Sequence, residues 1–284
     1  MQSIRDIKRR LQTVSDTGKI AKAMKAVSVS KLRKAQQAMG YAAGYAEHFE
    51  LALERTVCAL ETKQSRLLGN PDLSEVPICL VVISSDRGLC GAYNQRVLDR
   101  ADEFMESHEV TDVCALGRRA IHRMHRHGRA VLGFEARHAD QSEWDAARSL
   151  ARYLVNTVQR ERAGAVVVLQ NTFLNAMHYE TVARRLLPFH RPDTKEEAVE
   201  TEPGAEHLFR HVASRAAAAR LHHWIWEAVA SEHAARMVAM SDAYDNCGEL
   251  GSQLLRDLNK LRQSGITKEL LEIVSGAEAL QTQE

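Results

Sequence analysis

Fifty consecutive residues near the C-terminus, 231–280, contain no proline and carry a pattern typical of paired helices. Apolar or small residues recur there at alternating steps of four and three: Met240, Tyr244, Cys247, Gly251, Leu254, Leu258 and Leu261. Such heptad spacing indicates a helix that lies along another helix. The spacing continues at different offsets upstream (217–238) and downstream (266–280). A pattern that changes phase twice predicts one long helix that is contacted on several sides.

The five prolines all lie between residues 71 and 203. Because proline breaks helix interiors, this distribution predicts an N-terminal helical arm (1–70), an inserted domain (71–203) and a C-terminal helical arm (204–284). The N-terminal arm also has heptad spacing, at Ile4, Ile7, Leu11 and Val14, continued by Gly18 and Ala21. Two such arms that leave one compact domain together should pair antiparallel.

The inserted domain alternates apolar runs with helical patterns. We expect strands at 76–84, 110–116, 130–134, 165–169 and between 178 and 187, and helices at 91–107, 118–127 and 142–162. The run 76–84 is almost continuously apolar, as in a strand that is buried on both faces. The predicted fold class is therefore a mostly parallel, Rossmann-like α/β domain inserted between the two helices of a long antiparallel coiled coil.

The two arms differ in length, so the longer one should extend past the shorter. At 1.5 Å per residue they span roughly 85 Å and roughly 110 Å, which places Met1 opposite about residue 265. The residues beyond that point are still apolar on more than one face, with Ile266, Leu270 and Ile273 among them. Because a helix this apolar is not expected to stand in water, we expect a partner outside this chain to cover it.

Composition narrows the function classes. The net charge of +1 gives no overall field for nucleic acid or membranes. Residues 1–40 hold ten Lys/Arg and two Asp, which is either a solvated face or a surface for an acidic partner. No apolar run reaches about eighteen residues, so direct membrane insertion is not expected, and the first ten residues lack the apolar core of a secretory signal.

Cysteine and histidine usage suggests neither disulfides nor a metal site. The five cysteines are scattered and never spaced as CxxC, which fits a reducing cytoplasm. Histidines cluster at His122, His125 and His127 and again at His207 and His211, but neither cluster has a carboxylate at ligand spacing. We therefore predict exposed histidines, no metal and no cofactor.

The turn at residues 85–91, with sequence SDRGLCG, lies where the first expected strand leads into a helix. Enzymes with α/β folds hold phosphate loops or nucleophiles at this place. The turn lacks both the lysine-Ser/Thr pair and the GxGxxG pattern of a phosphate loop. Cys90 at a helix N-terminus is a candidate nucleophile. The alternative is a tight turn in which Gly88 and Gly91 permit unusual dihedrals.

Several long sequence words resemble the gamma subunit of F-type ATP synthases. The N-terminal arm has DIKRR (6–10), KAMK (22–25) and SKLRKAQ (30–36), and the SDRGLCG turn follows. The C-terminal arm has SEHAARMVAM (231–240), Asp245-Asn246, Asn259-Lys260, Arg262-Gln263 and ITKELLEIVSGAEAL (266–280). The rest of the insert is similar in layout. The chain departs from the family pattern at Ala21 and Ala26, where Thr and Met are usual, and in having Gly18 and Gly265 inside the helices.

The resemblance implies a central rotor shaft that transmits ion-driven rotation to three catalytic beta subunits for ATP synthesis, or hydrolysis in reverse. The shaft is not catalytic by itself. The implied partners are the ring of alpha and beta subunits, the epsilon subunit and the membrane ion-translocating c-ring. The implied location is peripheral, at the cytoplasmic face of a bacterial cell membrane. The coupling ion, proton or sodium, stays open.

The resemblance also assigns an interface with the alpha/beta ring, residue by residue. Its members are Met24, Lys25, Arg236, Arg262, Gln263, Ile266, Thr267, Glu269, Leu270, Ile273 and Leu280. A separate site is the matching turn of the inserted domain, with Asp86, Gly88 and Gly91. Arg262 and Gln263 match the pair that engages a loop of a beta subunit.

Two other functions are alternatives to the rotor shaft. One is an α/β enzyme that uses Cys90 as nucleophile with helical dimerisation arms, and the other is a scaffold coiled coil.

Overall fold

The computed structural model describes residues 3–60, 65–127, 131–134, 143–190, 201–202 and 204–281, without the side chains of 133–134 and 276–281. The chain divides into two compact units. The smaller unit joins residues 1–27 to residues 239–284, and the larger unit comprises residues 28–238. Each long terminal helix is therefore shared between the two units. The division of the chain into 1–70, 71–203 and 204–284 stays a prediction.

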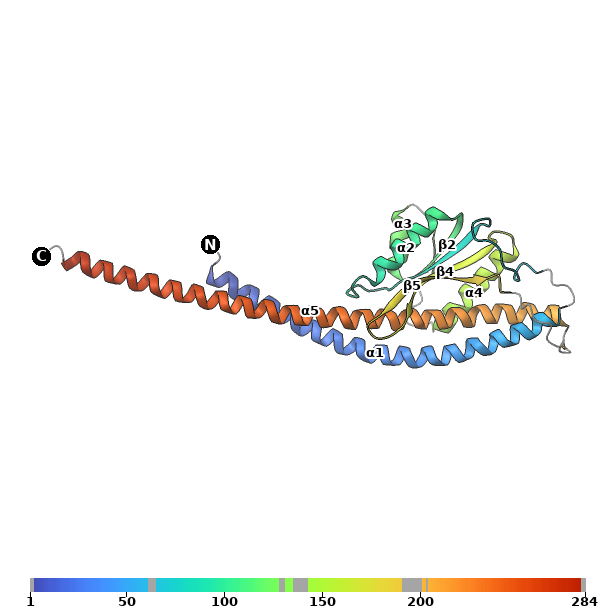
Figure 1. Cartoon of the computed structure of the whole chain (residues 1–284), viewed down its shortest axis with the longest axis horizontal. Coiled ribbons are helices and arrows are strands. Elements are labelled where there is room, and N and C mark those ends of the chain that lie inside the picture. The colour runs from blue at the N-terminus through green and yellow to red at the C-terminus, as the bar shows by residue number, and fades with distance from the viewer. Residues whose placement is uncertain are drawn as a thin grey trace. The chain divides into compact units, whose positions relative to one another are not determined.

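The order of elements confirms two terminal helices around an α/β insert (Figure 1). The elements are α1 (Ile4–Cys58), β1 (Ile78–Ile83), α2 (Tyr93–Ser107), β2 (Val110–Leu116), α3 (Arg118–Arg126), β3 (Val131–Phe134), α4 (Glu143–Gln159), β4 (Ala165–Phe173), β5 (Tyr179–Leu187) and α5 (Ala205–Gln281). Every strand and helix predicted for the insert is present, with ends that differ by up to four residues.

The sheet has the order β3-β2-β1-β4-β5 and is parallel except for β5, which pairs antiparallel with β4. This confirms the mostly parallel sheet. Strand β4 extends to Phe173, four residues past its predicted end at Leu169. Its polar half pairs with β5 as far as Phe173 opposite Tyr179, and Gln170 and Asn171 are buried there. Strand pairing therefore overrides the end of the apolar run.

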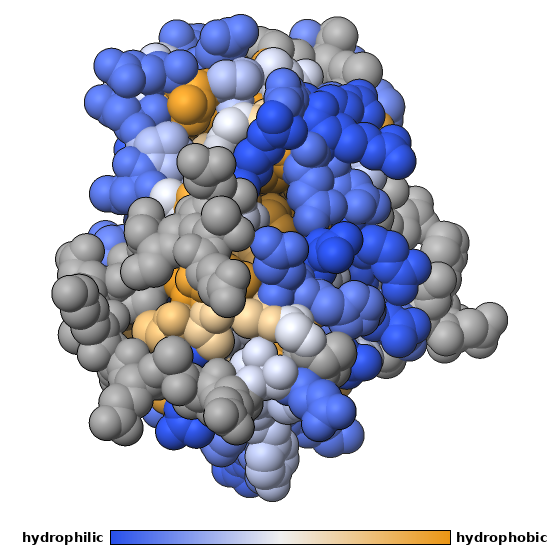
Figure 2. Space-filling view, turned by 90° about the vertical axis from the view of Figure 1, so that its right-hand side faces the viewer, coloured by the Kyte–Doolittle hydropathy of each residue, from blue (hydrophilic) through white to orange (hydrophobic). Residues whose placement is uncertain are grey.

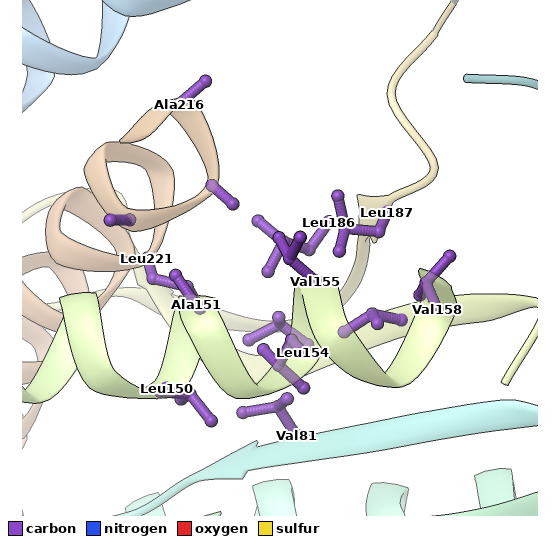
Figure 3. Close-up of a cluster of buried hydrophobic side chains, with 14 of the residues drawn as sticks. Val81, Leu150, Ala151, Leu154, Val155, Val158, Leu186, Leu187, Ala216 and Leu221 are labelled. Atoms are coloured by element: carbon purple, nitrogen blue, oxygen red, sulfur yellow. The ribbon is translucent and has the colours of Figure 1, made fainter. Parts of the chain in front are cut away.

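Helices cover both faces of the sheet. Alternate residues of β1 point to opposite sides, with Leu80 packing against α2 and α3, and Val81 packing in the core formed with α4, α5 and the end of α1. Figure 3 shows the second side, where Leu154 and Ala151 of α4 lie between β1 and α5. Burial on both faces explains why β1 is apolar at all six positions.

In the larger unit, α5 packs against α1 as well as against the sheet layer. Leu32 and Ala35 of α1 share a buried cluster with Ala230 and Ala234 of α5. Further along, Arg220 of α5 forms an ion pair with Glu50 of α1. The antiparallel pairing predicted for the arms is thus present within this unit.

In the smaller unit, three contacts fix the antiparallel register of α1 and α5. Lys25 Nζ donates to Ser241 Oγ at 2.9 Å, and Lys22 Nζ lies 5.8 Å from the ring centre of Tyr244. Gly18 packs closely against Cys247. The residue numbers of these pairs add up to 265 or 266, so the start of α1 at Ile4 lies level with about residue 262 of α5. This agrees with the length difference predicted for the arms.

The described side chains of α5 beyond that level, up to residue 275, are exposed although many are apolar. The exposed fractions are 53% for Ile266, 57% for Leu270, 61% for Leu271, 68% for Ile273 and 53% for Val274. The predicted seam before that level is inward-facing, with Met240 and Leu254 buried. Tyr244 is the exception on the seam, being 41% exposed.

No helix in the described part of the chain is long and apolar enough to cross a membrane. Hydrophilic residues make up most of the coloured surface on the face shown in Figure 2, with hydrophobic residues gathered toward its middle.

Deleting residues 266–284 should leave the melting temperature of the isolated chain within about 2 °C of the full chain, because the described side chains up to residue 275 bury little there. The contrasting variant is Leu254→Ala, which removes a buried seam residue and should cost about 2 kcal/mol or more. Circular dichroism melting of the three chains checks both. A loss of many degrees on truncation would mean that the end of α5 is packed within this chain.

Candidate functional site

The predicted interface residues near the end of α5 lie on an exposed helix. Arg262 and Gln263 are exposed at the level where α1 begins, and Thr267 and Glu269 are exposed in the following turns. Thr267 Oγ1 donates to the backbone carbonyl of Gln263 at 2.9 Å, an ordinary contact within a helix. Ile266, Leu270 and Ile273 form the apolar part of this surface. The side chain of Leu280 lies outside the described residues.

Met24 and Lys25 lie in the paired part of the smaller unit. Both are half-buried, and Lys25 is held by its hydrogen bond to Ser241. The assignment of these residues, and of those at the end of α5, to a partner interface stays a prediction.

The turn at 85–91 is a compact hydrogen-bonded structure at the carboxyl end of β1. The Ser85 backbone N–H donates to Asn94 Oδ1 at 3.0 Å, and Ser85 Oγ donates to the Arg87 carbonyl at 2.6 Å. Asp86 Oδ1 accepts the backbone N–H of Arg118 at 3.0 Å. These bonds give the turn a structural reason for its Ser, Asp and Asn side chains.

The backbone geometry of the turn favours glycine at one of its two glycine positions. Gly91 has φ +57°, in the left-handed region that favours glycine. At Gly88, a Cβ atom would lie 2.9 Å from a guanidinium nitrogen of Arg119, but this is the end of a flexible side chain that can move aside. The structure therefore supports the interpretation of this segment as a tight turn.

Arg236 has a role that the sequence did not predict. It is only 6% exposed, and its guanidinium binds the Glu232 carboxylate at 2.8 Å. It also donates to the backbone carbonyls of Gly88 at 3.3 Å and Arg87 at 3.4 Å. Arg236 thus ties the turn to α5 inside the larger unit. The spacing of Glu232 and Arg236, four residues apart on a helix, is the signal that could have indicated the ion pair. Its assignment to a partner interface stays a prediction.

The carboxyl edge of the sheet, where open α/β folds bind ligands at the change in strand order, is filled by the chain itself. Strand β1 lies at that change, between β2 and β4. Tyr93 fills the edge: its hydroxyl donates to the Ala228 carbonyl of α5 at 2.9 Å, and its own carbonyl accepts from Asn171 Nδ2 at 2.9 Å. Burial raises the pKa of the Tyr93 hydroxyl, which keeps it neutral and a donor.

The cavity that remains at this edge is about 40 Å³. It is lined by the turn, the end of β2 and α5. That volume suits a few water molecules and is far below the several hundred Å³ of a typical small-molecule pocket. As the described residues form it, this cavity is too small for a nucleotide.

Cys90 is 2% exposed, and its surroundings do not activate it. Burial raises the pKa of its thiol, although Arg236 opposes the effect. Its sulfur contacts Asn94 Nδ2 at 3.2 Å and lies 4.0 Å from Ser85 Oγ, and neither group is a general base. Within the described residues, no group of three or more His, Cys, Asp or Glu is arranged to hold a metal ion.

Comparison with known proteins covers the whole length of the chain. The family profile described as ATP synthase matches residues 3–280. The ATP synthase gamma chain of Rubrobacter xylanophilus is 35% identical over 295 residues, which cover 99% of each chain. The chain belongs to the ATP synthase gamma-chain family. The gamma chain of Syntrophobacter fumaroxidans is similarly related, with 33% identity over 291 residues and 99% of each chain covered.

Solved structures show the same fold at lower sequence identity. A chain of the mitochondrial ATP synthase of Euglena gracilis, in rotational state 3, aligns with a TM-score of 0.68 and 20% identity over 98% of this chain and 94% of its own. A chain from the central stalk and c-ring structure of the Tetrahymena thermophila mitochondrial ATP synthase aligns with a TM-score of 0.61 and 22% identity, covering 79% of this chain and 99% of its own. The fold shared with these solved structures agrees with the membership of the chain in the gamma-chain family.

Replacing Arg236 by Ala should destabilise the isolated chain by about 3–5 kcal/mol, because the buried Glu232 carboxylate loses its partner. The double variant Glu232→Ala/Arg236→Ala should recover part of that loss, since no unpaired buried charge remains. Urea unfolding of the single and double variants measures the difference. If Arg236→Ala unfolds like the wild type, the guanidinium does not hold the turn.

Cys90 should react with iodoacetamide much more slowly in the folded chain than after unfolding, because its thiol is buried and its pKa is raised. Cys58 and Cys247, which are partly exposed, are internal controls that should be labelled sooner. Peptide mass spectrometry of the labelled chain gives the three rates. Labelling of Cys90 before the other two would revive the nucleophile hypothesis.

Proposed function

We propose that this chain works as the central rotor shaft of an ATP synthase, that it transmits ion-driven rotation to three catalytic beta subunits, and that it carries out no reaction of its own. Family membership supports the shaft role. The alternative, an α/β enzyme with Cys90 as nucleophile, needs an accessible thiolate, and the burial of Cys90 argues against it.

One observation carries the partner assignment: α5 continues past the start of α1 with five large apolar side chains exposed, namely Ile266, Leu270, Leu271, Ile273 and Val274. Covering such a side chain is worth about 1.5–3 kcal/mol. A sleeve formed by alpha and beta subunits around this end would cover several of these side chains, and each would add that stabilisation to the complex. An apolar sleeve also suits rotation, because nondirectional contacts do not fix one angle as hydrogen bonds would.

Arg262 and Gln263 lie at the base of this apolar end, where α5 has just passed the start of α1. Both side chains are exposed. A guanidinium at this level can bind a carboxylate of a beta-subunit loop with two parallel hydrogen bonds. The basic face of residues 1–40 gives such a loop a favourable field.

We propose that the larger unit contacts the epsilon subunit and the c-ring. The Tetrahymena thermophila and Euglena gracilis chains come from structures that contain a c-ring, which supports the c-ring as a partner. The epsilon subunit and the peripheral position at the cytoplasmic face of the cell membrane follow from the family resemblance and belong to the same proposal. The bacterial relatives at 33–35% identity favour a bacterial enzyme complex.

Replacing Arg262 and Gln263 together by Ala should lower ATP turnover of the reconstituted complex by about tenfold or more, because a charge-assisted bond worth about 1.5–3 kcal/mol is lost. Folding of the isolated chain should be unchanged, since both residues are exposed. The matched control is Gln253→Ala/Arg256→Ala, which removes the same residue types from exposed positions beside α1. Normal turnover by the first variant, or equal loss in both, would refute the assignment of these residues to a beta-subunit loop.

A further inference from the structure

A basic groove runs between α4 and α5 in the larger unit. It consists of two adjoining hollows of about 270 Å³ and about 280 Å³. Arg152, His211 and Ser214 line both hollows. Arg210 and His207 complete the first hollow, and the second continues past Arg148 and Arg215 to Trp144.

The charges in this groove are all of one sign. Four arginines line the two hollows and no Asp or Glu does, although the whole chain has nearly equal numbers of acidic and basic residues. Arg148 has a weak ion pair with Asp145 at 3.7 Å. Arg152, Arg210 and Arg215 are exposed and form no ion pair with any carboxylate that the structure describes. Among the described residues, only the weak Arg148–Asp145 pair compensates the positive charge of the groove.

The remaining polar groups of the groove are suited to bind oxygen atoms. His207 and His211 are one helical turn apart, with their Nε2 atoms 3.2 Å from each other. Ser214, Asn156 and Gln159 add a hydroxyl and two amides. His207 also lies in the first turn of α5, where the helix dipole favours an anion. Guanidinium, imidazole, hydroxyl and amide groups are all hydrogen-bond donors to an oxyanion.

The groove is mounted on rigid elements. Beneath it, Ala151, Leu154 and Val155 of α4 are buried, as are Ala217 and Leu221 of α5 (Figure 3 shows the α4 residues and Leu221). The positions of the arginine Cα atoms are therefore fixed, so that little backbone ordering is required when a ligand binds.

We infer that the groove between α4 and α5 binds a phosphoanion, that is, a ligand with one or two phosphoryl groups, either as a soluble phosphate compound or as an anionic lipid headgroup. Four guanidinium groups offer more donors than a single carboxylate can accept, whereas a phosphoryl group accepts from several at once. Two hollows that share Arg152 suit two neighbouring phosphoryl groups. The inference rests on this groove alone and does not depend on the proposed shaft function.

The test is titration calorimetry of the full chain with inorganic pyrophosphate, with flotation of the chain on phosphatidylglycerol vesicles as a second arm. Arg152→Gln removes the arginine that both hollows share and should weaken pyrophosphate binding by about tenfold or more. The matched control is Arg126→Gln, which removes an exposed arginine of α3 away from the groove and should change affinity by less than about twofold.

The two arms distinguish the sources of the phosphoryl group. Vesicle binding that pyrophosphate displaces and that Arg152→Gln abolishes identifies a lipid headgroup. Pyrophosphate binding without flotation identifies a soluble phosphate compound. Neither binding in millimolar pyrophosphate nor flotation on vesicles, or equal weakening by Arg152→Gln and Arg126→Gln, would overturn the inference.

Discussion

The larger unit depends on an alanine-rich stretch of α5 that is buried from all sides. Ala213 and residues 216–219 are at most 1% exposed. A helix that touches α1, α4 and the sheet layer at once leaves no room for long side chains between the elements. Alanine keeps the helix stable and lets the neighbouring backbones approach. The same stretch explains why residues far apart in the chain, such as Leu53 of α1 and Leu187 of β5, share one hydrophobic core.

The position of α5 has a direct consequence for chemistry. A Rossmann-like sheet normally offers a binding crevice beyond the carboxyl ends of its strands. Here α5 accepts the hydrogen bond of Tyr93 at that edge, and Arg236 fastens the turn after β1 to α5. The fold keeps the strand order of a ligand-binding domain, but helix α5 packs against the edge of the sheet where such a domain binds its ligand. Fold and function are separable in this domain.

Local periodicity predicted most of this architecture. Heptad spacing indicated which residues of α1 and α5 face each other, and the alternation of apolar runs with helical patterns indicated the strands of the insert. These signals succeed because they repeat within a few residues of one another. Contacts between distant residues left no such signal: the carbonyl that Arg236 binds lies 148 residues away, at Gly88.

Polar residues within a strand made the predicted end of β4 wrong. Gln170 and Asn171 interrupt an apolar run and so suggested the end of a strand, but pairing with β5 keeps them in the sheet. The partner surface around Arg262 and Ile266 differs again. The sequence indicated that something must cover it, and the isolated chain contains no element among its described residues that does so.

The antiparallel pairing of α1 with α5 also means that each residue of α1 is synthesised long before the residue it contacts. Lys25 contacts Ser241, which is added 216 residues later. At a translation speed of about 5–20 residues per second, α1 waits roughly 10–40 s for its partner. During that time Ile7 and the rest of its apolar seam have no α5 to pack against. Helix α1 is therefore the first element made and among the last to be buried, which makes the nascent N-terminal arm the part of this chain most exposed to aggregation or chaperone binding.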